Sequence, residues 1–171
     1  LEPTRELASQ VETAFRDFSR YSKLRTTVLY GGVKYGKQTD ALQTGTDIIA
    51  ATPGRLLDHL SQRNTTLKHL EYLVLDEADR MLDMGIEPQI RQICQHLPRE
   101  GRQTGMFTAT WSQEVRRIAN DFLSQPTHVQ VGDQDLTSNT DIAQYVTIVS
   151  SEREKEKHLQ DKIFPMRQQV H

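Results

Sequence analysis

Four places in the sequence put polar or charged residues directly after a short apolar stretch and directly before a helical pattern. They are Pro3–Arg5, Ala51–Arg55, Leu75–Asp79 and Phe107–Thr110. If the apolar stretches are parallel strands, all four junctions lie at the carboxyl ends of those strands, along one edge of the sheet. Open α/β sheets bind their ligands along that edge. We therefore expect the chemistry of this protein to take place there.

The third junction is acidic. Asp76 follows the apolar segment Tyr72–Leu75, and a carboxylate in that position holds Mg²⁺ in P-loop nucleotidases. Mg²⁺ prefers one or two carboxylates together with waters and nucleotide phosphates, so we expect Asp76 to bind it through water. Glu77 would then orient and polarise the attacking water, and Asp79 is better placed for hydrogen bonds to neighbouring loops. Taken alone, these residues equally fit an acidic helix start that is favoured by the helix dipole.

The second junction suits an anion. Thr52 can cap a helix, Pro53 fits the first helical position, and Gly54 lets a ligand approach the backbone. The free amides and the positive end of the helix dipole would then face outward beside Arg55.

Two further segments offer similar places for a phosphate. Thr4 and Arg5 repeat the arrangement at the first junction, and Gly31-Gly32 follows a strand pattern. Each of these segments alone also fits an ordinary cap or turn. Three of them along one edge favour a track for a phosphodiester chain.

Strand and helix patterns alternate along the first part of the chain. The strand patterns cover 26–30, 48–51, 72–75, 105–108 and 128–131, and the helical patterns cover 4–19, 36–44, a segment from 53, a segment through 81–82, 86–97 and a segment from 112. This alternation predicts an α/β fold with a parallel sheet flanked by helices. Short, continuously apolar strands predict burial on both faces of the sheet.

The composition changes after the last of these strand patterns. Residues 132–144 are polar, small and turn-rich, which is typical of a linker. A strand pattern follows at 145–149, and Ser151 with Glu154 forms a capping-box pattern at the start of a charged helix. Since one strand and one helix cannot bury a core, we expect 1–131 to be one domain and 145–171 to begin a second.

The composition indicates a folded protein without a membrane span. The chain has 171 residues, of which 36% are hydrophobic and 26% charged, and its net charge is −2. That charge neither indicates nor excludes a nucleic-acid partner, because backbone amides and a few arginines can hold phosphates. The single cysteine, Cys94, lies on an apolar helical face and predicts a buried thiol in a reducing compartment. No apolar run approaches the about 20 residues that a membrane span needs.

These segments together resemble the DEAD-box RNA helicases, a family named after the quartet Asp76-Glu77-Ala78-Asp79. Pro3–Ala8 matches motif Ia, Gly31-Gly32 the GG element, Thr52–Arg55 motif Ib, and Thr108–Thr110 stands where motif III is expected. Each match is short, but five matches in the order and at the spacing of the family make the resemblance specific.

The resemblance implies two RecA-like domains that close over ATP and RNA. It also implies an ATP-hydrolysing enzyme that couples hydrolysis to RNA binding and to local duplex unwinding or remodelling of RNA–protein complexes. Asp76 resembles the Mg²⁺-linked carboxylate, Glu77 the water-positioning carboxylate, and Asp79 the residue that bonds toward motif III. Thr108 and Thr110 resemble the residues that couple the ATP state to unwinding.

RNA contacts are implied at the turns that match the family. The residues concerned are Thr4, Arg5, Gly31, Gly32, Thr52, Gly54 and Arg55. Contacts to the sugar-phosphate backbone position a strand without reading its bases, so we expect little sequence specificity. The resemblance further implies an intracellular protein of the nucleus or cytoplasm, a monomer with possible protein regulators and no membrane partner.

The chain departs from the family pattern at Thr108, at Gly85-Ile86, where the family often has Gly-Phe, and by the absence of one motif. Thr108 replaces the usual serine, which keeps the hydroxyl and adds a methyl group. No glycine-rich phosphate-binding loop with its lysine occurs, so we expect the N-terminal strand and that loop to be missing and this fragment itself to be inactive. A non-catalytic RNA-binding or scaffolding module with a degenerate ATP site is the alternative, and the intact acidic quartet argues against it. A DNA helicase would share the ATP chemistry but fits the motifs around Thr4, Thr52 and Asp76 less well.

Overall fold

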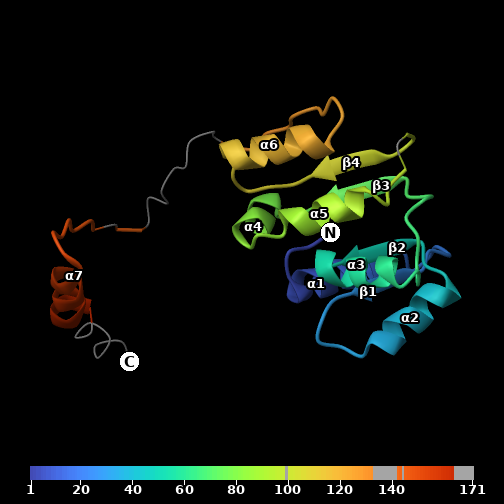
Figure 1. Cartoon of the computed structure of the whole chain (residues 1–171), viewed down its shortest axis with the longest axis horizontal. Helices are drawn as coiled ribbons and strands as arrows, with labels where there is room; N and C mark the ends of the chain where they lie inside the picture. The colour runs from blue at the N-terminus through green and yellow to red at the C-terminus, as the bar shows by residue number, and fades with distance from the viewer. Residues whose placement is uncertain (99, 133–141, 144, 164–171) are drawn as a thin grey trace. The chain divides into compact units, whose positions relative to one another are not determined.

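The computed structural model describes residues 1–98, 100–132, 142–143 and 145–163. The chain divides into two compact units, Leu1–Thr127 and His128–His171, which are described separately below. Figure 1 shows the first unit as short parallel strands with helices packed around them. No helix in the described ranges combines the length and the apolar character that crossing a membrane requires.

The described strands of the first unit form two parallel pairs. Strand β1 (Thr26–Leu29) pairs with β2 (Ile48–Ala51), and β3 (Tyr72–Leu75) pairs with β4 (Gln103–Met106). The two strands of each pair run in the same direction, so their carboxyl ends lie at one edge. The predicted α/β class with parallel strands is confirmed.

The segment Leu1–Glu2 joins the two pairs. The Leu1 ammonium donates a hydrogen bond of 2.6 Å to the carbonyl of Val74, and the amide of Asp76 donates one of 3.1 Å to the carbonyl of Leu1. This is the bonding pattern of a parallel neighbour. On the other side, the amide of Glu2 donates to the carbonyl of Ala51 over 2.9 Å. The carboxyl ends of β2 and β3 therefore lie at the same edge.

Helices pack around these strands. Helix α1 contacts β1 and β2, α2 contacts β1, α3 packs against α5 and α4 packs against α6. Their bounds are α1 Arg5–Phe18, α2 Tyr35–Thr44, α3 Pro53–Ser61, α4 Ala78–Asp83, α5 Glu87–Cys94 and α6 Gln113–Phe122. The apolar core is built mainly from Leu29, Ala51, Leu56, Leu60, Leu73, Leu75, Met81, Ile90 and Ile93.

Several details of the burial differ from the prediction. Strand β3 is buried on one face only, because Tyr72 is 66% exposed and Val74 41% exposed. The predicted apolar stripe of α1 is buried only in part, because Phe15 and Phe18 are exposed. The fully buried residues of this helix are Ala8 and Glu12. Cys94 is only partly buried, and burial raises the pKa of its thiol.

Two predicted strands are wrong. Residues 128–131 and 145–149 have no strand structure in the described part of the chain, and β4 begins two residues before the predicted 105–108 segment. Apolar and β-branched residues favour a strand only where a neighbour is present to pair with, so a strand-like pattern alone is a weak guide. Most of the predicted linker, 133–141 and residue 144, lies outside the described residues.

The second unit contains the predicted charged helix. Helix α7 (Glu152–His158) is followed by a π-helical turn, Leu159–Ile163. The hydroxyl of Ser151 accepts a hydrogen bond from the amide of Glu154 over 3.3 Å, as the capping-box pattern predicts. The carboxylate of Glu154 accepts from the amide and hydroxyl of Ser150 over 2.8 and 2.7 Å, so the returning bond is displaced by one residue.

We expect Glu2 to make the stability of this chain depend on pH. Glu2 is only 4% exposed, and burial raises its pKa from 4.5 to about 6; the Leu1 ammonium opposes this shift, while Asp76 and Glu77 add to it. Between pH 4.5 and about 6, the Glu2 carboxyl group is therefore protonated more fully in the folded state than in the unfolded state. The charged form at higher pH destabilises the fold, and below 4.5 the effect disappears.

The substitution Glu2→Gln should therefore raise the urea midpoint at about pH 7.5 and leave it unchanged at about pH 4. Glu6→Gln is the matched control, because Glu6 is exposed. A gain from Glu2→Gln that is equal at both pH values would contradict this account.

Candidate functional site at the carboxyl edge of the strands

Backbone hydrogen bonds place the predicted junctions in one continuous row. The amide of Thr52 donates to the carbonyl of Leu29 over 2.9 Å, which puts the second junction beside the end of β1 and its Gly31-Gly32 turn. The hydrogen bonds of Leu1–Glu2 then connect the second junction, Ala51–Arg55, to the first, Pro3–Arg5. They also connect the first junction to the third, Leu75–Asp79. The amide of Ala78 donates to the carbonyl of Phe107 over 3.0 Å, which connects the third junction to the fourth.

The acid pair lies between the end of β3 and the start of α4. One oxygen of Asp76, Oδ1, accepts a hydrogen bond of 2.9 Å from the amide of Glu77. Glu77 has φ 48° and ψ 52°, a left-handed conformation that is costly for a residue with a side chain. Such strain is maintained only where the surroundings enforce it, and it occurs preferentially at functional sites.

One carboxylate oxygen of Glu77, Oε2, has no hydrogen-bond donor among the described residues. This oxygen is buried, and Arg80 Nη1 lies 3.8 Å away, beyond hydrogen-bonding distance. A buried acceptor without a donor is costly, so it points to a missing water or ion. This carboxylate is therefore suited to hold and orient a water molecule.

Asp79 connects the acidic junction to the Thr108–Thr110 segment. Its Oδ2 accepts hydrogen bonds from the amide and from the hydroxyl of Thr110, both 2.9 Å long. The Thr108 hydroxyl donates to the carbonyl of Thr110 over 2.9 Å, which braces the same loop. Burial alone would raise the pKa of Asp79, but hydrogen bonds from Thr110 and the Arg80 amide outweigh it and hold the pKa below its ordinary value. Asp79 is thus ionised at neutral pH, and its bonds to Thr110 are charge-assisted.

The first junction and the glycine turn lie in contact. Thr4 caps α1, since its hydroxyl accepts a hydrogen bond from the amide of Leu7 over 3.3 Å. The guanidinium of Arg5 lies so close to Gly32 that a Cβ there would be 2.8 Å from Nη1. Gly32 also has φ 85°, which other residues rarely adopt. The backbone conformation therefore favours glycine at this position, whereas the exposed Arg5 side chain can move away from a Cβ.

The second junction differs from the prediction in two respects. Thr52 occupies the N-cap position of α3, but its hydroxyl does not cap the helix and lies 3.5 Å from the carbonyl of Leu29 instead. The Arg55 side chain is only 14% exposed and turns toward Tyr35 and Gln38 rather than fully outward. Gly54 remains partly exposed at the helix start, where the amides and the dipole favour an anion.

Three residues near the edge were not singled out from the sequence. Glu2 is a buried carboxylate beside the acid pair, and Gln38 and His59 are buried polar side chains behind Arg55. The spacing of Arg55 and His59, four residues apart on α3, was an available signal that both lie on one helix face. The burial of Glu2 had no such signal, because a glutamate between Leu1 and Pro3 is ordinarily exposed.

The acid pair fits a magnesium ion that is held mainly through water. The described residues contain no cluster of three or more His, Cys, Asp or Glu side chains that could enclose a metal. Mg²⁺ keeps several waters and needs only one or two carboxylates in addition to phosphate oxygens. Asp76, half-buried with an oxygen not used by Glu77, and the unpartnered Oε2 of Glu77 match that requirement.

Comparisons with known proteins identify the family of this chain. The family model described as DEAD/DEAH box helicase matches residues 1–118. The chain is 49% identical over 157 residues to ATP-dependent RNA helicase dbp2 of Aspergillus clavatus and 48% identical over 162 residues to DBP2 of Candida glabrata. These matches cover 92% and 93% of this chain, and 28% and 30% of the relatives. The chain thus spans less than a third of the length of these relatives.

A solved structure is also similar. A hypothetical ATP-dependent RNA helicase from Sulfolobus tokodaii superposes with a TM-score of 0.67 at 38% identity, over 72% of this chain and 37% of that one. Its similarity supports the RecA-like arrangement of strands and helices. With the family model matched over more than half of its residues and the acidic quartet at the expected edge, the chain belongs to the DEAD/DEAH box helicase family.

Proposed function

We propose that this chain is part of an ATP-dependent RNA helicase that couples ATP hydrolysis to RNA binding and to local duplex unwinding or remodelling of RNA–protein complexes. The observation that carries the proposal is the row of backbone hydrogen bonds from Leu29, two residues before Gly31-Gly32, to Phe107, which immediately precedes Thr108–Thr110. That row puts phosphate-binding turns and an acid pair on the same edge. The names of the relatives, which are ATP-dependent RNA helicases, support the same activity.

In this proposal the acid junction serves the nucleotide. Asp76 would hold Mg²⁺ through water, and Glu77 would orient the water that attacks the terminal phosphate of ATP. The ion, when bound, neutralises charge on the phosphate oxygens. The left-handed backbone conformation of Glu77 and its buried Oε2, which accepts no hydrogen bond from the described residues, support this role.

The turns on the other side of Leu1–Glu2 serve the RNA. Their proposed contacts are Thr4, Arg5, Gly31, Gly32, Thr52, Gly54 and Arg55, from amides, hydroxyls and guanidinium groups. All these groups suit a sugar-phosphate backbone and none is arranged to read bases. We therefore propose binding with little dependence on RNA sequence.

Asp79, Thr108 and Thr110 are the proposed coupling residues. Their hydrogen bonds tie the acid junction to the next loop, so a shift at the nucleotide is transmitted there. The Thr108 hydroxyl donates a hydrogen bond to the carbonyl of Thr110, which a serine hydroxyl could also do. The presence of threonine in place of the usual serine therefore does not favour a non-catalytic module.

The domain organisation completes the proposal. We propose that 1–131 belongs to the N-terminal RecA-like domain, that 132–144 is the interdomain linker and that 145–171 begins the C-terminal RecA-like domain. The end of the first compact unit at Thr127 supports the first boundary to within a few residues. A monomer acting in the nucleus or cytoplasm, with possible protein regulators, fits this proposal.

The first test removes the water-orienting carboxylate. In the complete protein that carries this chain, Glu77→Gln should lower RNA-stimulated ATP hydrolysis by roughly 100-fold or more, because general-base contributions have that size. Binding of ATP and RNA should persist, measured by fluorescence anisotropy with labelled RNA. Glu71→Gln, an exposed glutamate before the opposite end of β3, is the control. Unaltered turnover in Glu77→Gln would remove Glu77 from this role.

The second test separates hydrolysis from unwinding. Thr110→Val removes the hydroxyl that donates a hydrogen bond to Asp79. It keeps the hydrogen bond from the backbone amide of residue 110 to Asp79 and the volume of the side chain. Losing one charge-assisted hydrogen bond should reduce strand displacement about tenfold while ATP hydrolysis changes less than about twofold.

Thr108→Ser is the matched variant, because it keeps the donating hydroxyl of that loop. Its displacement rate should equal that of the unaltered protein. Equal losses of hydrolysis and displacement in Thr110→Val would argue against a coupling role.

A further inference from the structure

A buried polar network lies behind the two RNA-facing turns. It consists of side chains from α2 and from α3 and its C-terminal end: Tyr35, Gln38, Arg55, His59 and Asn64. Gln38 is 6% exposed and His59 is completely buried. Burying polar groups is unfavourable unless their hydrogen bonds are made, so such a network needs a specific arrangement.

Gln38 occupies the centre of this network. Its Nε2 donates a hydrogen bond of 3.0 Å to the carbonyl of Tyr30, the residue immediately before Gly31-Gly32. Its Oε1 accepts from Arg55 Nη1 over 3.4 Å and lies 3.2 Å from His59 Nε2. One side chain thus contacts both the glycine turn and the arginine of the second junction.

The protonation of His59 follows from its other neighbour. The side-chain nitrogen of Asn64 can only donate, and it lies 3.2 Å from His59 Nδ1, so Nδ1 is the acceptor and Nε2 carries the proton. Burial lowers the pKa of His59, and the charge of Arg55 lowers it further, which keeps the ring neutral. The proton on Nε2 therefore points to Gln38 Oε1. With Oε1 taken by donors, the amide group of Gln38 is held in one orientation.

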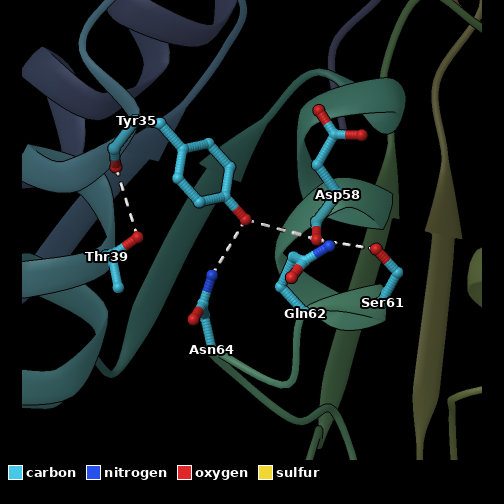
Figure 2. A pocket seen from close by; sticks show the side chains of 6 residues that line it. All are labelled: Tyr35, Thr39, Asp58, Ser61, Gln62 and Asn64. Atoms are coloured by element: carbon cyan, nitrogen blue, oxygen red, sulfur yellow. Dashed lines mark hydrogen bonds between the residues drawn. The ribbon is translucent and has the colours of Figure 1, made fainter.

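Tyr35 and Asn64 close the outer side of the network. Figure 2 shows the Tyr35 hydroxyl between Asn64 and the backbone of Asp58. Asn64 donates to this hydroxyl over 2.8 Å, and the hydroxyl donates to the carbonyl of Asp58 over 3.3 Å. The Tyr35 ring stacks on His59 with centroids 4.3 Å apart and an interplanar angle of 9°. The ring therefore fixes the imidazole in the plane that reaches Gln38.

Arg55 is held by this network rather than by solvent. Its guanidinium carbon lies 5.2 Å from the centre of the Tyr35 ring, and its Nε is 3.6 Å from Asp58 Oδ2. With 14% of the side chain exposed, only part of the guanidinium is available to a ligand. The direction of that part depends on Gln38 and Tyr35, which both come from α2.

We propose that Gln38 is a positioning residue, which holds the guanidinium of Arg55 and the peptide that leads into Gly31-Gly32 in one arrangement, so that both turns meet the same RNA strand. This inference rests on the proposed function, because it assumes that Arg55 and the glycine turn face RNA. A single amide side chain spans the two turns, so replacing it by an apolar side chain of similar length releases both. Gln38 itself does not touch the RNA.

The test is a double-mutant cycle in the complete protein. Kd for a labelled single-stranded RNA is measured with a non-hydrolysable ATP analogue for Gln38→Met, Arg55→Ala and the double variant. Each single variant should weaken binding about tenfold. Because Gln38→Met also releases the glycine turn, the double variant should be weaker than Arg55→Ala, but by clearly less than a further tenfold. The slope of log Kd against the logarithm of the salt concentration should fall in both single variants by the amount that corresponds to about one phosphate contact. Loss of packing alone would not change that salt dependence.

Gln43→Met is the matched control, because Gln43 lies exposed on the same helix. It should leave Kd and its salt dependence unchanged. Gln38→Asn, which keeps the amide but cannot span both partners, carries the test if Gln38→Met does not fold. Additive losses in the double variant, or an unchanged Kd in either single variant, would overturn the positioning role. Failure of the unaltered protein to bind RNA would instead overturn the proposed function.

Discussion

The candidate site depends on the backbone hydrogen bonds that Leu1 and Glu2 make to the strands on either side. Each such bond contributes only about 1 kcal/mol to stability. Their structural effect is larger, because β1 and β2 otherwise have no described backbone connection to β3 and β4. Parallel pairing through this segment fixes which ends of the strands lie together. Acidic and cationic groups that are far apart in sequence consequently share one edge.

At the acidic part of this edge, the geometry separates two carboxylates by role. Glu77 is strained and has a buried oxygen that accepts no hydrogen bond from the described residues. The Oδ2 of Asp79 accepts two hydrogen bonds from Thr110, which keep it charged. In the proposed function, the first carboxylate acts on water and the second connects the acid junction to the next loop. Neighbouring residues of one short sequence obtain different chemistry from their different hydrogen-bond partners.

At the part of the edge proposed to bind RNA, the positive charge comes from a few arginines and not from a broadly basic surface. The chain has a net charge of −2, so long-range attraction to a polyanion is weak. The proposed binding of RNA therefore relies on a few amides and arginines. Arg5 lies against Gly32, and Arg55 is packed against Tyr35 and the buried Gln38.

The sequence by itself predicted most elements of the first unit and the edge at which the junctions lie. Local patterns suffice where the partner strand is present, as for the apolar run Tyr72–Leu75 followed by Asp76. The pattern at 145–149 was wrong for the converse reason: a strand needs a partner, and a sequence pattern does not supply one. Only the tertiary structure decided that Glu2 is buried, that Asp79 reaches Thr110 and that Arg55 turns inward to Gln38. Those features arise from contacts between distant segments, whose distances and burial no local pattern encodes.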